Sequence, residues 1–395
     1  MNTEDIKKNI TKGIKDVKKI GKEIGKKIND IKEIINFNFY DYIAKYGNYT
    51  LEEKEFNEID NVILSMLTYI DFSGIVSEDD KEKISLSDAS ERVLNKFSKK
   101  EIKNSIVGTR VGFKLLESIS AKKRYKDILL FNYLYEGNED SQFSACTFDL
   151  GNKLYYVGFE GTDKLISGWE EDCKMSYMFP VEAHKLAIKY LSRFIFKNVK
   201  LIIGGHSKGG NLALVSSMYT NFLVKYKIKK IYSNDGPGLR NEQINSNKYK
   251  NIEKKYVHII PDSSIVGLFL RNKNNYIVIK SNMPGFISHD PTTWQIDNDK
   301  FERTKLSRFS KVFDEGFSKW LDNYTDLERE EFVKDIFDIL RENKIETLLQ
   351  FTENYKLIFD VLKSSKNVNN VTKEMGKDLV KVITQTNLEY PLFKW

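Results

Sequence analysis

Ser207 stands at the centre of a G-H-S-K-G segment at residues 205–209. An apolar run at residues 201–203 precedes this segment, and small and apolar residues follow it. This order predicts a strand, a sharp turn and a helix, with Ser207 at the apex. A side chain at either glycine would collide with the neighbouring strand or helix, and the helix N-terminus would direct unpaired N–H groups at an oxygen beside Ser207. The pattern is typical of a nucleophile elbow, although a glycine-rich turn that holds a phosphate shares it.

A serine hydroxyl needs a base to take its proton, and the chain has four histidines. His206 belongs to the elbow, and we expect its side chain to point away from the catalytic face. His184 lies in a predicted helix before the elbow. His258 lies inside an apolar strand, where a buried, hydrogen-bonded imidazole is expected. His289, in a loop beyond the last predicted strand, is free to reach over the strand ends and is our candidate base.

The carboxylate that orients the base is expected at a strand end, after the serine and before the histidine in chain order. Asp262 directly follows the predicted strand 256–260, and Asp235 follows the strand before it. We prefer Asp262 because it lies one strand further from the elbow. Asp235 remains the alternative.

Two N–H donors should face the oxygen that becomes negative in the transition state, each typically worth ~3 kcal/mol. The backbone N–H of Lys208, the residue after the serine, is one candidate. The other is expected in the loop after an earlier strand, where Gly161-Thr162 follows an apolar segment. Such a mechanism needs no metal and no cofactor.

The elements that must position these residues follow from hydrophobic periodicity and turn residues. Strands at 143–150 and 153–159 flank Gly151-Asn152, which predicts a hairpin. Helices are then predicted at 181–196 and 211–225, and strands at 200–203, 228–233, 256–260 and 276–279. This alternation predicts an α/β fold with a mainly parallel central sheet, helices on both faces, and functional groups at the carboxyl ends of the strands. Further helices are predicted before the sheet, at 56–72, 102–118 and 122–135, and from residue 300 onward, where they would cover the sheet or form a cap.

Residues 1–35 form a lysine-rich segment with an apolar stripe at three-and-four spacing, which predicts a basic amphipathic helix. Three glycines in it each weaken the helix by up to ~1 kcal/mol. Packing on the protein itself or on a second copy is the favoured interpretation, and docking on an anionic membrane is the alternative. The stripe consists of Ile10, Ile14, Val17, Ile24, Ile28, Ile31 and Ile35.

Composition limits the class of protein. The 395 residues include 41% hydrophobic residues and only six prolines, which is a globular composition. The net charge of +7, from 63 basic and 56 acidic residues, is unlike that of a nucleic-acid-binding protein. Two cysteines are too few for a disulfide framework, so we expect reduced thiols. Neither a membrane span nor a secretory signal is found in the sequence. We therefore expect a cytoplasmic protein, and peripheral contact with a membrane through residues 1–35 is the open alternative. The expected division is 1–35, a domain at 36–300 and a helical region at 301–395.

The motifs together resemble the class 3, fungal-type lipase family of α/β-hydrolases. They are Phe-x-Gly-Thr at a strand end, Gly-His-Ser-x-Gly-Gly about 45 residues later, an Asp in a strand-end loop and a later His. The chain is more similar still to the bacterial Mbeg-like branch, over roughly residues 37–395. The segments that carry this resemblance are Phe56-Asn57-Glu58-Ile59-Asp60, residues 205–213, Asn234-Asp235-Gly236-Pro237-Gly238, Ser263-Ser264-Ile265-Val266-Gly267 and His289-Asp290-Pro291.

The resemblance implies a triad of Ser207, Asp262 and His289, and an oxyanion hole from Thr162 and Lys208. Glu160 stands where lipases usually carry arginine, and Lys208 where they carry leucine, so a more polar pocket entrance is expected. If residues 1–35 meet anionic lipid, a phospholipase or lysophospholipase is expected rather than a soluble esterase. Lys208 and the surrounding lysines would then favour a substrate with a phosphate or carboxylate.

The expected function is a serine ester hydrolase of lipase, phospholipase or esterase type that acts through an acyl-enzyme. Peptidase and thioesterase activities would use the same groups. The alternative is a catalytically inactive scaffold of the same fold that binds a membrane or protein partner through residues 1–35.

Overall fold

The computed structural model describes residues 38–137, 142–162, 166–273, 275–345 and 368–389. The basic amphipathic helix predicted at residues 1–35 lies outside the described residues, so it stays a prediction. Within the described ranges, no helix is both long enough and apolar enough to cross a membrane.

A single eight-stranded sheet organises the chain, with its strands side by side in sequence order. The strands β1 to β4 pair antiparallel, and β4 to β8 pair parallel. The prediction of an α/β fold with a mainly parallel sheet is therefore confirmed. The strands are β1 (Ile84–Ser85), β2 (Leu129–Gly137), β3 (Gln142–Asp149), β4 (Leu154–Phe159), β5 (Lys200–His206), β6 (Ile228–Asn234), β7 (Tyr256–Pro261) and β8 (Ile277–Ile279).

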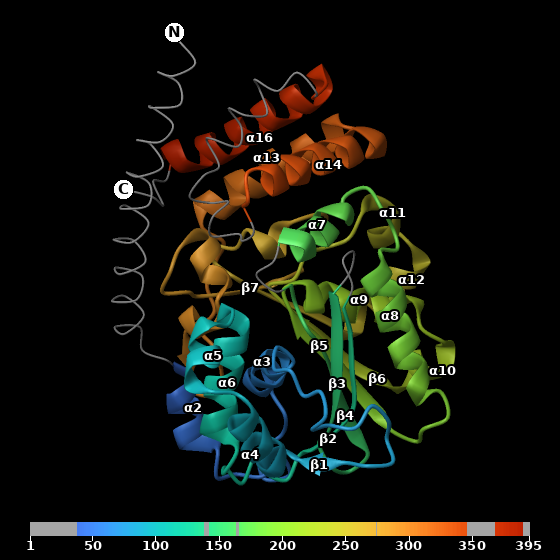
Figure 1. Cartoon of the computed structure of the whole chain (residues 1–395), viewed down its shortest axis with the longest axis vertical. Coiled ribbons are helices and arrows are strands. Elements are labelled where there is room, and N and C mark those ends of the chain that lie inside the picture. The colour runs from blue at the N-terminus through green and yellow to red at the C-terminus, as the bar shows by residue number, and fades with distance from the viewer. Residues whose placement is uncertain (1–37, 138–141, 163–165, 274, 346–367, 390–395) are drawn as a thin grey trace.

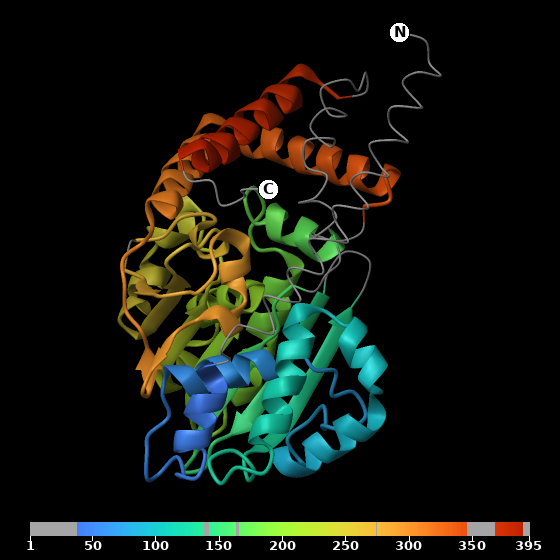
Figure 2. The same ribbon diagram turned by 90° about the vertical axis from the view of Figure 1, so that its left-hand side faces the viewer.

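Helices cover both faces of this sheet, as expected (Figures 1 and 2). Side chains alternate along a strand, so Ile202 of β5 packs into one core while Leu201 and Ile203 pack into the other. The first core is shared with α3 (Glu58–Leu67) and α6 (Val107–Ile119), and the second with α8 (Glu182–Leu191) and α9 (Lys208–Tyr219). Because α9 directly follows β5, the elbow lies between these two layers.

The smaller helices before the sheet include α2 (Asn38–Tyr46), α4 (Leu86–Lys96) and α5 (Lys99–Asn104). The prediction of a helix at 122–135 is wrong, because residues 129–137 form β2. This segment pairs antiparallel with β3 along its length, and pairing with a neighbouring strand overrides local helical spacing. The hairpin between β3 and β4 is confirmed, with Gly151, Asn152 and Lys153 all at positive φ in its turn.

The C-terminal helices form a cap above the carboxyl ends of the strands (Figures 1 and 2). They are α13 (Arg308–Asn323), α14 (Asp326–Glu342) and α16 (Asn370–Glu389). Phe313, Phe317 and Trp320 of α13 form a continuous stack of rings in the core of the cap. Trp169 of α7 (Ile166–Lys174) packs against this core, so the cap reaches the helix that follows β4.

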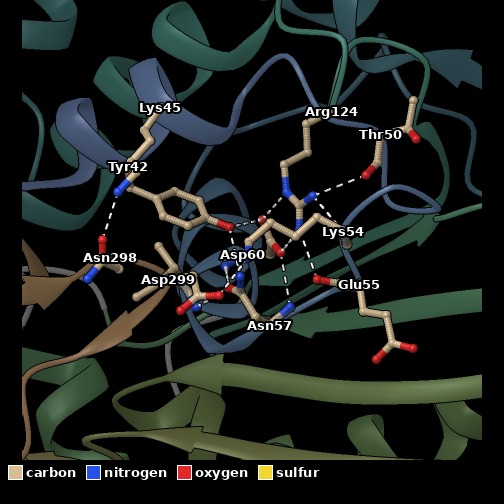
Figure 3. A network of polar contacts seen from close by, with 11 residues as sticks. Tyr42, Lys45, Thr50, Lys54, Glu55, Asn57, Asp60, Arg124, Asn298 and Asp299 are labelled. Atoms are coloured by element: carbon tan, nitrogen blue, oxygen red, sulfur yellow. Dashed lines mark hydrogen bonds and ion pairs between the residues drawn. The ribbon is translucent and has the colours of Figure 1, made fainter.

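A buried polar cluster fixes the position of α3 (Figure 3). The carboxylate of Asp60 accepts hydrogen bonds from Arg124 Nε at 2.8 Å, from the Tyr125 hydroxyl at 2.7 Å and from the backbone N–H of Asn57 at 3.0 Å. Asn57 caps the helix by accepting from the N–H groups of its first turn. Because Asp60 and Arg124 are both buried, the pair ties α3 to the loop before β2. This is the structural basis of the Phe56–Asp60 motif.

Candidate active site

Ser207 occupies a sharp turn between β5 and α9. Its backbone has φ 58° and ψ −132°, a conformation that L-residues rarely adopt. A Cβ at Gly205 would lie 2.3 Å from the carbonyl carbon of Gly209, and a Cβ at Gly209 would lie 2.1 Å from the carbonyl oxygen of Phe159, so both positions exclude side chains. The N–H of Ser207 donates to the carbonyl of Asn234, which holds the turn against the end of β6. The predicted nucleophile elbow therefore has the expected strand-turn-helix geometry and strained backbone.

His289 lies in a one-turn 3₁₀ segment, Gly285–His289, and pairs with Asp235 at the end of β6. Its Nδ1 lies 2.7 Å from Asp235 Oδ2. The other carboxylate oxygen, Oδ1, accepts from Ser264 Oγ at 2.5 Å and from the N–H of Gly267 at 3.1 Å. Asp235 is fully buried and the His289 ring is 19% exposed. The imidazole is therefore oriented by a rigidly held carboxylate while one side stays accessible.

Asp262, the preferred candidate from the sequence, is not the partner of His289, and Asp235, the alternative, holds that position. The backbone carbonyl of Asp262 accepts from Ser307 N–H and Ser310 Oγ, at the start of α13. Burial raises the pKa of its carboxyl. The reason for the difference is local: Asp235 has φ 50°, and this left-handed turn directly after β6 directs its side chain to the His289 loop.

His206 does not point away from the catalytic edge as expected. Its ring centroid lies 4.4 Å from that of His289, and its Nε2 lies 2.8 Å from the backbone carbonyl of His289. A carbonyl only accepts, so Nε2 carries the proton and Nδ1 accepts from the Tyr69 hydroxyl at 3.0 Å. Burial, with His289 as a second cause, holds the pKa of His206 well below its usual value. The neutral ring thus ties the His289 loop to the residue before Ser207.

The remaining two histidines hold the loop that follows β6. His258 Nε2–H donates to the carbonyl of Gly236, next to Asp235, and the expectation of a buried, hydrogen-bonded residue is confirmed. His184 Nε2–H donates to Oδ1 of Asn211, whose amide nitrogen donates to the carbonyl of Gly238. Burial lowers the pKa of each of these two imidazoles to about 4. Neither is placed to act as a base.

The side chain of Lys208 turns inward and forms a buried ion pair with Glu171 of α7. The distance from Nζ to Oε2 is 3.0 Å, and the two side chains are 1% and 3% exposed. Glu171 Oε1 also accepts from the backbone N–H of Ala183. The expectation that Lys208 makes the pocket entrance polar is therefore wrong, because its charge is paired below the surface.

Thr162 is held by the other buried acid of α7. Its hydroxyl donates to Asp172 Oδ2 at 2.6 Å. Burial raises the pKa of Asp172 to about 7, although the neighbouring Lys208 lowers it. The loop that bears Thr162 also reaches Ser207, because a Cβ at Gly161 would lie 3.0 Å from the Cβ of Ser207. Thr162 and Lys208 thus flank Ser207, and α7 packs against both of them.

The structure brings Ser207, His289, Thr162 and Lys208 to the same edge of the sheet and adds Asp235, while it places Asp262 in other contacts. The sequence prediction did not include Glu171 and Asp172. Three consecutive acidic residues in a short helix, Glu170, Glu171 and Asp172, with a lysine directly after the serine, were the signal that could have revealed them.

These features define a lipase-like α/β-hydrolase fold with a nucleophile elbow. The chain belongs to the Mbeg1-like family, whose sequence model matches residues 119–338, more than half of the chain.

Three solved structures illustrate what the chain is similar to. The M37 lipase has 14% identity and a TM-score of 0.35, with 54% of this chain and 70% of that chain covered. The Rhizomucor miehei lipase in its propeptide complex has 15% identity and a TM-score of 0.30, with 45% and 68% covered. Lip2 lipase from Yarrowia lipolytica has 13% identity and a TM-score of 0.30, with 46% and 72% covered. No curated protein matches the chain.

Proposed function

We propose that the protein is a serine hydrolase that cleaves a carboxylic ester through an acyl-enzyme. In this mechanism His289 takes the proton of the Ser207 hydroxyl as the oxygen attacks the ester carbonyl, and returns it to the leaving alcohol. Asp235 keeps the imidazole in the tautomer with Nδ1 protonated, which leaves Nε2 to act as the base. The backbone N–H groups of Thr162 and Lys208 would face the oxyanion. Water then hydrolyses the acyl-enzyme by the same proton route.

The pairing of His289 with Asp235 is the observation that carries this proposal. Buried carboxylate and imidazole groups can pair for structural reasons alone, but here Asp235 directly follows Asn234, whose carbonyl accepts from the N–H of the strained Ser207. The bond from His206 to the His289 carbonyl joins the two loops directly. Strain of this kind persists only where the surrounding structure imposes it, and it is concentrated at functional sites.

The substrate is proposed only as a carboxylic ester. The argument for a phosphate-bearing or carboxylate-bearing substrate depended on a free Lys208 ammonium group. That group is paired with Glu171 below the surface, and Asp172 lies beside it. The charge close to Ser207 therefore gives no preference for an anionic substrate, and a neutral ester is the form to test first.

Fluorophosphonate labelling tests the nucleophile. We expect the full chain to be labelled and Ser207→Ala to lose the label. Ser87→Ala removes an exposed serine from α4 and serves as the matched control, so it should be labelled like the wild type. Equal labelling of the wild type and Ser207→Ala would contradict the proposal.

A panel of p-nitrophenyl esters of different acyl lengths, with phospholipids and thioesters as further arms, tests the reaction. Hydrolysis that is abolished in both Ser207→Ala and His289→Ala supports ester hydrolysis. A chain that folds, is not labelled and hydrolyses none of these compounds would instead favour the scaffold that binds a partner.

A further inference from the structure

Three aromatic side chains project into solvent close to the start of β5 and β6. Phe196 is 94% exposed, Tyr226 is 89% exposed and Phe222 is 74% exposed. Isolated apolar side chains on a surface need no explanation, but large aromatic rings this exposed on adjacent segments usually mark an interaction site. Phe222 and Tyr226 belong to α10 (Phe222–Lys227), at the lower right of Figure 1.

The geometry of α10 directs these rings outward together. Val224 is fully buried and defines the inner side of the helix. Phe222 and Tyr226 are four residues apart, so they share the opposite side. Lys227 Nζ donates to the backbone carbonyls of residues 194, 195 and 197, each within 2.7 Å, and so holds the segment with Phe196 against α10. The segment that bears Phe196 is therefore held beside the helix that bears Phe222 and Tyr226.

Lysines are the charged residues of the α10 segment itself, while Lys197, next to Phe196, pairs with Asp80. Residues 219–230 contain four lysines and no acidic residue. Lys255 Nζ donates to the carbonyl of Lys225, which brings a second lysine-rich segment alongside α10. Burial lowers the pKa of Lys225 and of Lys255, and a neighbouring lysine, Lys248 or Lys229 respectively, lowers each further. The cations are thus close enough to repel one another, and an anionic partner would relieve this repulsion.

We propose that this surface, made of Phe196, Phe222 and Tyr226 with the adjacent lysines, docks on an anionic lipid bilayer. We name it the α10 face. Exposed aromatic rings enter the boundary between lipid head groups and acyl chains, and lysines next to them meet the negative head groups. An acidic protein would pair with the lysines as well, but it would leave the three exposed rings without an apolar environment unless it carried a matching groove.

The α10 face lies on the edge of the sheet opposite to Ser207. Phe196 precedes β5 and Ser207 follows it, and seven residues at ~3.3 Å each separate the two edges by roughly 20 Å. The inference does not depend on the proposed ester hydrolysis. If the docking and the ester hydrolysis are both correct, the docked protein presents its candidate active site away from the bilayer. The ester would then reach this site from solution.

A fluorophore at position 222 tests the docking directly. The Phe222→Cys variant, in a Cys173→Ser background, is labelled with an environment-sensitive dye and mixed with vesicles of phosphatidylcholine with or without phosphatidylglycerol. We expect a blue shift of emission with the anionic vesicles only. The matched control carries the dye at Leu327→Cys on α14, a position that is 76% exposed in the cap, and should show no shift. This local readout is independent of any binding by residues 1–35.

Pelleting of the full chain with the same anionic vesicles gives the second measurement. Phe222→Ser with Tyr226→Ser should weaken binding at least ~10-fold, and Lys229→Glu should do the same through charge. Leu327→Ser should bind like the wild type. An unshifted dye at position 222 would overturn the proposal. So would a shift that rises with protein concentration in the absence of vesicles, because that result would identify a contact between copies of the chain.

Discussion

His289 Nδ1 lies 2.7 Å from Asp235 Oδ2, although 54 residues separate them in the chain. The opposite oxygen of the carboxylate is held by Ser264 and Gly267, from the loop after β7. Three strand-end loops therefore converge on one carboxylate. Such convergence fixes the direction of the imidazole more firmly than a single contact could, because each bond restricts a different rotation of Asp235.

The pair predicts which acid supports catalysis. Asp235→Asn should lower kcat/KM for a p-nitrophenyl ester by ~10³- to 10⁴-fold, because an amide cannot stabilise the imidazolium and favours the wrong tautomer. Asp262→Asn is the matched control, since it changes the alternative acid in the same way, and it should stay within a few-fold of the wild type. A similar loss in both variants, or a larger one in Asp262→Asn, would show that the assignment of Asp235 is wrong.

The ion pair between Lys208 and Glu171 should stabilise the contact between α9 and α7. Lys208→Met leaves a buried carboxylate without its cation and should lower the free energy of unfolding by ~3–5 kcal/mol. Adding Glu171→Gln should recover much of that loss. Urea denaturation measures both values.

The exposed pair of Lys185 and Glu182 provides the control for that measurement. Lys185→Met should change the free energy of unfolding by less than ~1 kcal/mol. If Lys208→Met behaves in the same way, the ion pair does not hold the two helices together.

Because of Asp172, the free energy of unfolding should fall as the pH rises. Its pKa is raised from 3.8 to about 7 by burial, so the folded protein retains a proton that the unfolded chain has lost. This contribution to stability is complete below the pKa that Asp172 has in the unfolded chain, and it is lost as the pH rises toward 7. Asp172→Asn still accepts from Thr162 but does not titrate.

The wild type and Asp172→Asn should therefore differ more in their free energies of unfolding at high pH than at low pH. Relative to the wild type, Asp172→Asn should gain ~2–3 kcal/mol of stability between pH 5 and pH 8. Urea midpoints at the two pH values give this difference, and other titrating groups cancel because both proteins share them. A difference that is independent of pH would mean that Asp172 is already ionised at pH 5.

Substitution of Asp60 should destabilise the fold more than substitution at most positions outside the candidate site. Asp60→Asn leaves the buried guanidinium of Arg124 without its counter-ion and should cost ~3–5 kcal/mol in the free energy of unfolding. Asp71→Asn, which breaks an exposed pair with Lys96, should cost less than ~1 kcal/mol. Thermal or urea unfolding compares them. Equal costs would show that the cluster in Figure 3 contributes no more than a surface pair.

Local sequence patterns were sufficient to predict the elbow, the β3–β4 hairpin and the parallel arrangement of the later strands. Each depends on neighbouring residues: glycines that permit a tight turn, β-branched residues that alternate between two faces, and helices long enough to cross over the sheet. The segment at residues 129–137 shows the limit of this approach. Its apolar residues suit a helix as well as a strand, and only the presence of β3 beside it decides between them.

The sequence by itself determined the candidate nucleophile, the candidate base and the class of fold, because these depend on short motifs and on a choice among four histidines. Only the tertiary structure decided between Asp235 and Asp262, paired Lys208 with Glu171 and placed His206 against His289. The reason is that both aspartates end neighbouring strands at the same edge, one strand apart. Which one meets the imidazole depends on the backbone conformation of a single turn residue and on contacts from loops distant in the chain.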